Sequence, residues 1–344
     1  KLAAIAASVG IFFSIVANIL SATPLVAALF QTDFTRAVAF VMALTVIYVV
    51  FGGVWATGRV GIWKTILIYI TLISVAYVTY TRMNGWNGFL SAFPSTPWFS
   101  LIGRGWGVDL GSGLSLLVGT LTTQTYIQAL FSATDEKTAK AGAVTAALIT
   151  LPSGIPAVMV GMFMRQHHPD IVPIDALPLF VLTYLPPWLG GLAIAALLLA
   201  AIGSAAGLAL GVGAMLNRDL LSAMKWRFFE DHALLTNRLV VFLVMMGAAT
   251  FTFGNLRSLV LEWNFLSMGL RGAGIFFPFS LAIFMPGRVN SGFALLSIAA
   301  GTVATIGWKF IFPQGMDPLY AGLAVSILVL CGSFFSPRQS RHGD

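Results

Sequence analysis

The stretch LLLAAIGSAAGLALGVGAMLNRDL, residues 197–220, is typical of a long apolar helix, yet it contains one hydroxyl, that of Ser204. Beside it, three glycines at every fourth position form one ridge on which another helix can approach closely: Gly203, Gly207 and Gly211. A polar atom inside an apolar helix costs free energy unless it is paired. Ser204 either donates to the carbonyl of Ala200 or joins nearby carbonyls around a hard cation such as sodium, which takes oxygen ligands.

The composition of the whole chain indicates an all-α polytopic membrane protein. Of its 344 residues, 58% are hydrophobic and only 9% are charged, against about 25% in an average soluble domain. Mean hydropathy is +0.90. The net charge of +7 fits basic loops that face an anionic lipid surface better than it fits a nucleic-acid partner, and none is expected. The single cysteine, Cys331, excludes an internal disulfide.

Runs of about 20 apolar residues predict about ten transmembrane helices. They lie at about residues 4–30, 36–55, 61–81, 111–130, 140–164, 189–216, 234–253, 258–284, 289–311 and 318–336. Two of the intervening loops are long, 82–110 and 165–188. We expect the lipid bilayer to be the main partner of this chain.

The distribution of lysine and arginine predicts the orientation of these helices, because cytoplasmic loops carry the excess of positive charge. One set of loops holds Lys1, Arg59, Lys64, Lys137, Lys140, Arg218, Lys225, Arg227, Arg288, Arg338 and Arg341. The opposite set holds Arg36, Arg82, Arg104, Arg165, Arg257 and Lys309. The first set is expected to be cytoplasmic, so that both ends of the chain lie inside and both long loops lie outside, where they cover a central site.

Several predicted spans contain helix-breaking or polar segments. The sequence SGIP places a proline inside 140–164, and Pro278 lies inside 258–284. The span 111–130 begins GSGLSLLVG and continues TLTTQTYIQ, which puts hydroxyls and amides on every face of two turns. Because polar groups at membrane depth must face protein or a water-filled cavity, this segment is expected to line a site.

The chain lacks the usual motifs of an enzyme, such as HExxH, GxSxG, GxxxxGK or paired CxxC. The adjacent His167 and His168 suit one metal ion poorly. Acids near the membrane are limited to Glu262 and Asp109, so a proton relay through buried carboxylates has few members. We therefore expect no enzymatic activity and no cofactor.

Arg271 is the most costly residue of the predicted spans, since a charge near the middle of a span costs on the order of 2.5–3.5 kcal/mol. Glu262 lies about 13 Å away on a straight helix, too far for an easy ion pair. Arg271 either binds the carboxylate of a solute or caps carbonyls freed by Pro278 and the nearby glycines. The sequence leaves both interpretations open.

Three motifs resemble those of the sodium:solute symporter family. YIQALFSATDEKTAKAG (126–142) is similar to the family's polar helix and the cytoplasmic loop after it. LPPWLGGLAIAALLLAAIGSAAGLALGVGAMLNRDL (185–220) is similar to its signature helix, and VVFGGVWATGRVGIWK (49–64) to its Gly-Gly-x-x-Ala turn. Their order and spacing agree over nearly the whole chain.

The resemblance implies a LeuT-type bundle of two inverted five-helix repeats in one transmembrane domain, 1–344, with solute and ion near the membrane midplane. Residues 1–81 would end the first repeat, 111–284 would form the second, and 289–336 would be peripheral. The first two core helices would then be missing, which makes an N-terminally truncated fragment the expectation. The polar run 120–128 would be the broken sixth helix, whose expected solute contacts are Thr123, Gln124, Tyr126 and Gln128.

The resemblance also implies a sodium site on the eighth core helix, made of two adjacent hydroxyls and one backbone carbonyl. Ser204 matches the first hydroxyl and Ala201 the carbonyl donor, but Ala205 occupies the second hydroxyl position. Other departures are Val60, Gly61 and Lys64 in the family's Thr-Asp-x-x-Gln, and Ala129 in place of an arginine.

The expected function is secondary active transport of a small polar organic solute, coupled to sodium and located in the inner or plasma membrane. Arg271 favours an anionic or zwitterionic solute, and the tryptophans and tyrosines equally favour a solute with a ring or a sugar that they stack on. Because Ala205 removes one ligand, the alternatives are a proton-coupled or uncoupled transporter, or a solute sensor that kept the fold without transport. A membrane-embedded transferase would need a buried histidine or acid cluster, and a channel fits the broken polar helix less well.

Overall fold

The computed structural model describes residues 1–221, 232–254, 260–312 and 316–335, without the side chains of 50–60, 233, 334 and 335. Within these ranges the regular structure is helical. Five basic residues used to predict orientation lie outside the described residues: Lys225, Arg227, Arg257, Arg338 and Arg341. Residues 258 and 259 of the span 258–284, residue 336 of the span 318–336 and the side chain of Val60 also lie outside the described part of the chain.

The helices follow one another with short connections. They are α1 (Leu2–Phe30), α2 (Phe34–Arg82), α3 (Gly85–Ala92), α4 (Ser95–Trp98), α5 (Trp106–Leu121), α6 (Gln124–Phe131), α7 (Glu136–Thr150), the 3-10 turn η1 (Leu151–Ser153), α8 (Gly154–His167), the 3-10 turn η2 (Pro173–Asp175), α9 (Ala176–Tyr184), α10 (Pro187–Leu216), the π-helical turn η3 (Asn217–Leu221), α12 (Ala233–Phe253), α13 (Val260–Phe284), α14 (Ser291–Ile311) and α15 (Pro318–Phe335).

Seven helices within the described ranges are long and apolar enough to cross a membrane. They correspond to the predicted spans 4–30, 61–81, 140–164, 189–216, 234–253, 258–284 and 289–311. Two further predicted spans match the shorter apolar helices Phe34–Val49 and Pro318–Ser333. The tenth, 111–130, is divided between α5 and α6. The all-helical, multi-pass class is confirmed. Of the ten predicted spans, 111–130 is interrupted, while 36–55 lies within the longer helix α2 and 318–336 matches the 18 residues of α15.

The prediction of separate helices at 36–55 and 61–81 is wrong in one respect, because α2 runs without interruption over 49 residues. At 1.5 Å per residue such a helix is about 74 Å long, more than twice the roughly 30 Å of a hydrocarbon core. Gly52 and Gly53, near the end of the predicted span 36–55, lower helix propensity there. They keep their backbone N–H groups, and no proline follows them in α2, so the hydrogen-bond ladder continues.

Two of the expected helix interruptions are present and one is not. The chain leaves helical geometry between α5 and α6, and a 3-10 turn that contains Pro152 separates α7 from α8, just before the SGIP sequence. By contrast, α13 continues through Pro278, so this proline does not break its helix. A proline removes one backbone hydrogen bond, a loss that neighbouring helices in a membrane bundle can compensate.

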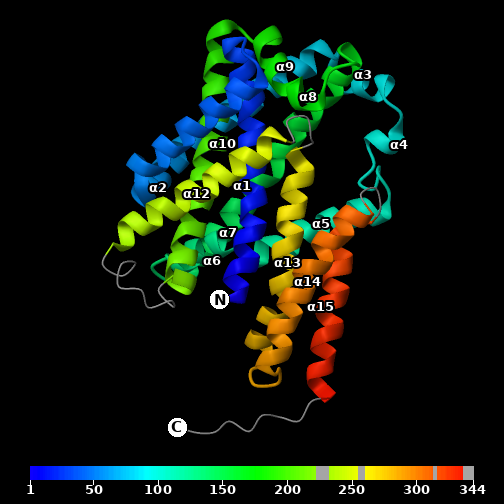
Figure 1. Ribbon diagram of the computed structural model, residues 1–344. Coiled ribbons are helices and arrows are strands. Elements are labelled where there is room, and N and C mark those ends of the chain that lie inside the picture. Colours follow the sequence, from blue (N-terminus) through cyan, green and yellow to red (C-terminus); the bar gives the residue numbers. More distant parts are fainter. Residues whose placement is uncertain (222–231, 255–259, 313–315, 336–344) are drawn as a thin grey trace.

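Helix α1 lies in the middle of the bundle and packs against α2, α10, α12 and α13 (Figure 1). Its side chains Ile11, Ile15, Ile19 and Leu20 are fully buried. Helices α13, α14 and α15 pack against one another, and α5 packs against α13. The short helices α3, α4, α8 and α9 gather at one end, at the top of Figure 1. We call this end the α9 end; it holds both loops predicted to lie outside.

The packing of α5 against α13 depends on Gly119. A Cβ atom built on Gly119 would lie 2.6 Å from Met268 Cβ and 2.8 Å from the Cα atom and carbonyl oxygen of Met268. We expect Gly119→Ala to lower the free energy of unfolding by about 1–3 kcal/mol, because a helix backbone must move aside. Thermal unfolding in detergent measures the change.

Gly113 supplies the matched control for this prediction, since it lies in the same helix and a Cβ there meets nothing within 4 Å. Alanine also has the higher helix propensity, so Gly113→Ala is expected to stabilise the protein by up to about 1 kcal/mol. Equal unfolding temperatures for the two variants would contradict the close approach of α5 and α13.

Candidate functional site

The interruption between α5 and α6 is made by two threonines. Thr122 follows the last residue of α5, and Thr123 has extended geometry, with φ −80° and ψ 114°. The Thr122 hydroxyl donates to the Val118 carbonyl at 2.9 Å, and the Thr123 hydroxyl donates to the Gly119 carbonyl at 2.5 Å. These hydroxyls bond carbonyls near the end of α5. The predicted break in the polar run 120–128 is therefore confirmed.

A pair of buried serines joins α1 to α13 next to this break. Their hydroxyl oxygens, in Ser14 and Ser267, lie 2.6 Å apart. The Ser267 hydroxyl also lies 2.5 Å from the carbonyl oxygen of Gly10. A Cβ on Gly10 would lie 2.6 Å from Arg271 Cγ, so the absence of a side chain there makes room for the arginine. The two helices thus meet at a small, polar contact.

Arg271 lies at this contact and is 1% exposed. Its Nη1 donates to the Thr123 hydroxyl at 2.9 Å. Its Nη2 lies 3.2 Å from the Ser14 hydroxyl, 2.9 Å from the Ser267 hydroxyl and 3.2 Å from Met268 Sδ. Its Nε donates to the carbonyl of Ser267 at 3.1 Å. One guanidinium therefore connects α1, α13 and the α5–α6 break.

The positive charge of Arg271 has no carboxylate partner among the described residues, because none of their ion pairs includes it. Removing a guanidinium from water costs several kcal/mol, and neutral hydroxyls compensate for this only in part. Of the two interpretations of Arg271, the bonding of carbonyls by its guanidinium is observed, but at a different carbonyl from the one expected. It bonds the carbonyl of Ser267, four residues back, rather than that of Gly274, which Pro278 deprives of its donor.

Arg271 also lines a cavity of about 470 Å³ between α1, α6, α10 and α13, here called the central cavity. Its lining residues are Ser14, Asn18, Thr125, Tyr126, Gly203, Ser204, Gly207, Leu208, Asn264, Met268 and Arg271. The opening stretch of the sequence, the polar run and the buried arginine thus meet around one space. Its wall carries hydroxyls, amides, one phenol and one unpaired positive charge.

Ser204 does not bond the carbonyl of Ala200. Its hydroxyl has no hydrogen-bond partner in the part of the chain that the structure describes, whereas the hydroxyls of Ser8, Thr23 and Thr45 each donate to the carbonyl four residues back. Ser204 is half-buried and lines two cavities. An unused hydroxyl of this kind is free to bind something that enters the cavity.

The two alanines of the expected ion site have different surroundings. Ala201 lies on the wall of a second cavity, while Ala205 is 1% exposed and packs in the apolar core. A hydroxyl at position 205 would therefore be buried. The geometry brings Ala201 and Ser204 to the same cavity wall and leaves Ala205 behind it.

The second cavity, of about 520 Å³, leads toward the α9 end and is here called the vestibule. Pro173, Ile174 and Leu177 contribute to its wall from η2 and α9. Asn18 and Ser204 line both the vestibule and the central cavity. The loop 165–188 therefore contributes to the wall of the vestibule, whereas the vestibule has no described lining residue from the loop 82–110.

The four polar residues predicted to contact the solute divide into two groups. Tyr126 lines the central cavity, and Thr123 lies behind its wall, bonded to Arg271. Gln124 lines neither cavity, and its buried Oε1 has no hydrogen-bond partner. Gln128 is exposed and also lines neither. The structure thus brings Thr123 and Tyr126 to the site and leaves Gln128 outside it.

Four polar residues of α1 and α13 at this site were not predicted from the sequence: Ser14, Asn18, Asn264 and Ser267. Ser14 and Asn18 are four residues apart on α1, and the Asn18 amide donates to the Ser14 carbonyl at 2.7 Å. Asn264 and Ser267 are three residues apart on α13, and Arg271 follows four residues later. Each pair lies on one helix face, a spacing that was visible in the sequence.

Comparison with known proteins identifies the family and the fold. The sequence model of the Sodium:solute symporter family matches residues 1–301. No curated protein matches the chain. A solved structure, a Na+-coupled sialic acid symporter in a substrate-bound, outward-open state, is similar to the chain with a TM-score of 0.70 and 20% sequence identity. The match covers 97% of this chain and 75% of that one. The expected transporter fold is thereby confirmed.

Proposed function

The chain belongs to the sodium:solute symporter family, and we propose that it uses a sodium gradient to carry a small polar organic solute across a cell membrane. The solute binds in the central cavity. Sodium binds on the wall of α10 at Ser204. The membrane is an inner or plasma membrane, with the α9 end outside, as the distribution of lysine and arginine predicts.

The observation that carries this proposal is the unpaired hydroxyl of Ser204 at the junction of the central cavity and the vestibule. Sodium takes neutral and charged oxygen ligands, and the wall of α10 offers the Ser204 hydroxyl together with the backbone carbonyl of Ala201. A helical carbonyl keeps one lone pair after it accepts its own hydrogen bond. Ala205 adds no side-chain oxygen, so the site is weaker than one with two hydroxyls.

The solute carries an anionic group, on this proposal, because Arg271 places an uncompensated positive charge on the cavity wall. An incoming carboxylate would supply the charge partner that the described residues lack. Tyr126, Asn18 and Asn264 line the same cavity and would bind the uncharged part of the solute. Sialic acid, the substrate of the structural neighbour, is an acid and is one candidate to test.

The interrupted helix α5–α6 and the helices bonded to it are suited to alternating access. Discontinuous helices near the midplane are typical of transporters whose bundles rock around a fixed site. Here the α5–α6 break is tied to α1 and α13 through Thr123 and Arg271. The division into two inverted repeats, 1–81 and 111–284, with 289–336 peripheral, is part of the proposal.

A second candidate function rests on Ala205. Because this position lacks the second hydroxyl, coupling to protons, uncoupled transport or solute sensing without transport would account for the same cavity. The two candidate functions differ in the coupling ion, since only sodium coupling requires Ser204 to bind a metal cation.

The stability of the purified protein in sodium and in potassium tests the proposal. A ligand that binds only the folded state raises the unfolding free energy by RT ln(1 + [L]/Kd), about 2.7 kcal/mol when its concentration is a hundred times Kd. We expect a higher unfolding temperature in NaCl than in KCl at equal ionic strength. Equal unfolding temperatures in NaCl and KCl at every salt concentration from about 1 to about 500 mM would reject sodium binding. The second candidate function would then remain.

A further inference from the structure

A third cavity lies on the other face of α13, beside α5, α14 and α15. It holds about 300 Å³ and is here called the peripheral pocket. Polar residues on its wall come from the loop before α5, from α5, α13 and α14, and from the residue before α15: Arg104, Ser112, Glu262, Thr305, Lys309 and Asp317. It shares no lining residue with the central cavity or the vestibule. Nothing in the proposed transport cycle uses it.

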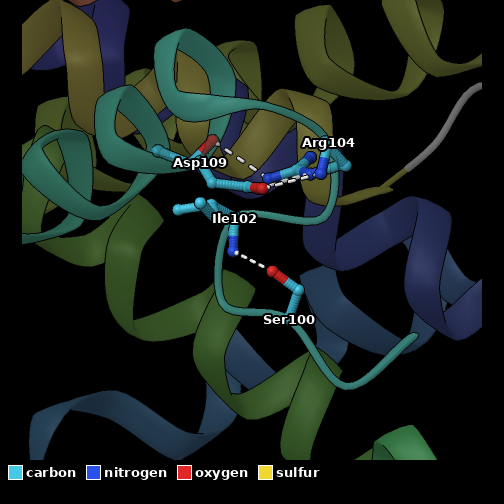
Figure 2. A network of polar contacts seen from close by, with 5 residues as sticks. Ser100, Ile102, Arg104 and Asp109 are labelled. Atoms are coloured by element: carbon cyan, nitrogen blue, oxygen red, sulfur yellow. Dashed lines mark hydrogen bonds and ion pairs between the residues drawn. The ribbon is translucent and has the colours of Figure 1, made fainter. Parts of the chain in front are cut away.

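Arg104 is already held by an acid of its own. Its backbone N–H donates to Asp109 Oδ2 at 2.8 Å and its Nε to Asp109 Oδ1 at 2.7 Å, as Figure 2 shows. Its Nη2 lies 3.3 Å from the Ser112 hydroxyl. In the same loop, the backbone N–H of Ile102 donates to the Ser100 hydroxyl. The loop is thus fixed, and the charge of Arg104 is neutralised by Asp109.

Lys309 and Glu262 form the second charge pair of the pocket, with 3.5 Å between Nζ and Oε2. Glu262 lies on the first turn of α13 and Lys309 on the last turn of α14. Both side chains are partly exposed, so the pair is adjustable and contributes little to stability. It closes one side of the pocket without using the remaining acid.

Asp317 is that remaining acid. Its Oδ1 accepts from the backbone N–H of Leu319 at 2.9 Å and from the Ser115 hydroxyl at 3.2 Å. Among the described residues it has no ion-pair partner within 4 Å. Burial raises the pKa of this carboxyl, against the effect of its hydrogen bonds and of the more distant Lys309 and Arg104. With Arg104 paired to Asp109 and Lys309 paired to Glu262, Asp317 is the one carboxyl on the described pocket wall without a cationic partner within 4 Å.

The remainder of the pocket wall is apolar. Phe265 and Leu266 of α13, Phe312 after α14 and Leu319 of α15 contribute to it. The volume equals that of about ten water molecules, at roughly 30 Å³ each. A pocket that combines one unpaired carboxylate with an aromatic and aliphatic wall is suited to a molecule with a cationic end and an apolar body.

We propose that the peripheral pocket binds a small organic ammonium compound, whose charged group pairs with Asp317 and whose apolar body packs against Phe265 and Phe312. The hydroxyls of Ser112 and Thr305 supply acceptors for the remaining ammonium protons. The bound molecule lies on α13 on the face away from Asn264, Met268 and Arg271. The site is thus separate from the proposed solute and sodium sites.

Binding of 2-phenylethylammonium to the purified protein tests this inference, with 2-phenylethanol as the neutral molecule of the same shape. Both are added in KCl buffer without sodium, and the unfolding temperature is measured against concentration. We expect a saturable rise with the ammonium compound and none with the alcohol. A rise of equal size with both would overturn the inference, since it would report partition into apolar surface.

Asp317→Asn removes the charge and keeps the cap of α15, because the amide oxygen still accepts from Leu319. We expect it to weaken binding of 2-phenylethylammonium by about tenfold or more. The matched control is Asp135→Asn, which changes an aspartate that caps α7 by accepting from Thr138. This control is expected to bind like the wild type.

Unchanged affinity in Asp317→Asn would overturn the inference. Ser204→Ala separates the two proposals, because it should abolish the sodium effect and leave binding of the ammonium compound intact. Loss of both effects in Ser204→Ala would show that the pocket is not an independent site.

Discussion

Arg271→Met is expected to abolish uptake of an anionic solute while the helix bundle stays folded. Loss of a buried, hydrogen-bonded charge partner costs about 2–5 kcal/mol, which is roughly 30-fold to several thousand-fold in affinity. The screen uses liposomes with an inward sodium gradient and labelled carboxylated solutes, including sialic acid, amino acids and hydroxy acids. Each solute that the wild type takes up is then tested with Arg271→Met.

The fold is expected to survive this change because the groups around Arg271 keep other partners. Ser14 and Ser267 remain bonded to each other, and Thr123 remains bonded to the Gly119 carbonyl. Removal of a buried charge without a carboxylate partner leaves the unfolding free energy unchanged or raises it.

Two further arginine variants make this prediction specific. Arg271→Lys keeps a charge but loses the planar fork that bonds three hydroxyls, so it should restore only part of the uptake. Arg36→Met removes an exposed arginine that pairs with Asp33, and it should transport like the wild type. Full uptake of every solute by Arg271→Met would exclude a solute carboxylate at this position.

Ser204→Ala is expected to remove the difference between the unfolding temperatures in sodium and potassium. The substitution deletes one oxygen from a wall that offers one hydroxyl and one carbonyl, so little of the site remains. Because the Ser204 hydroxyl bonds no carbonyl among the described residues, its loss should leave stability in potassium unchanged. Differential scanning fluorimetry in the two salts measures both quantities.

Ser8→Ala is the matched control for the sodium effect, since the Ser8 hydroxyl donates to the Ala4 carbonyl within α1 and lines neither cavity. It should keep the full difference between the salts. Ala205→Ser adds the hydroxyl that the family pattern has at this position, and we expect it to increase sodium affinity. A sodium effect that persists in Ser204→Ala would place the ion elsewhere.

Local patterns in the sequence predicted the elements whose causes are local. Apolar runs of sufficient length identified seven of the crossing helices, because the cost of placing polar groups in lipid depends on each segment's own composition. The family resemblance implied the break in the run 120–128, and its cause is local, since Thr122 and Thr123 bond carbonyls only three or four residues away. The apolar runs predicted separate helices at 36–55 and 61–81, whereas α2 is continuous, because Gly52 and Gly53 weaken a helix without ending it.

The sequence alone thus determined the membrane class, the polar character of residues 120–128 and the cost of burying Arg271 and Ser204. Only the tertiary structure decided what these residues contact. Arg271 bonds Thr123, 148 residues away, and Ser14, 257 residues away, and Ser204 has no partner in the described chain. The place of the Asp317 carboxyl on the wall of the peripheral pocket, without an ion-pair partner among the described residues, likewise depends on how α15 packs. Helix formation is governed by neighbours along the chain, whereas the pairing of buried polar groups is governed by which helix faces meet.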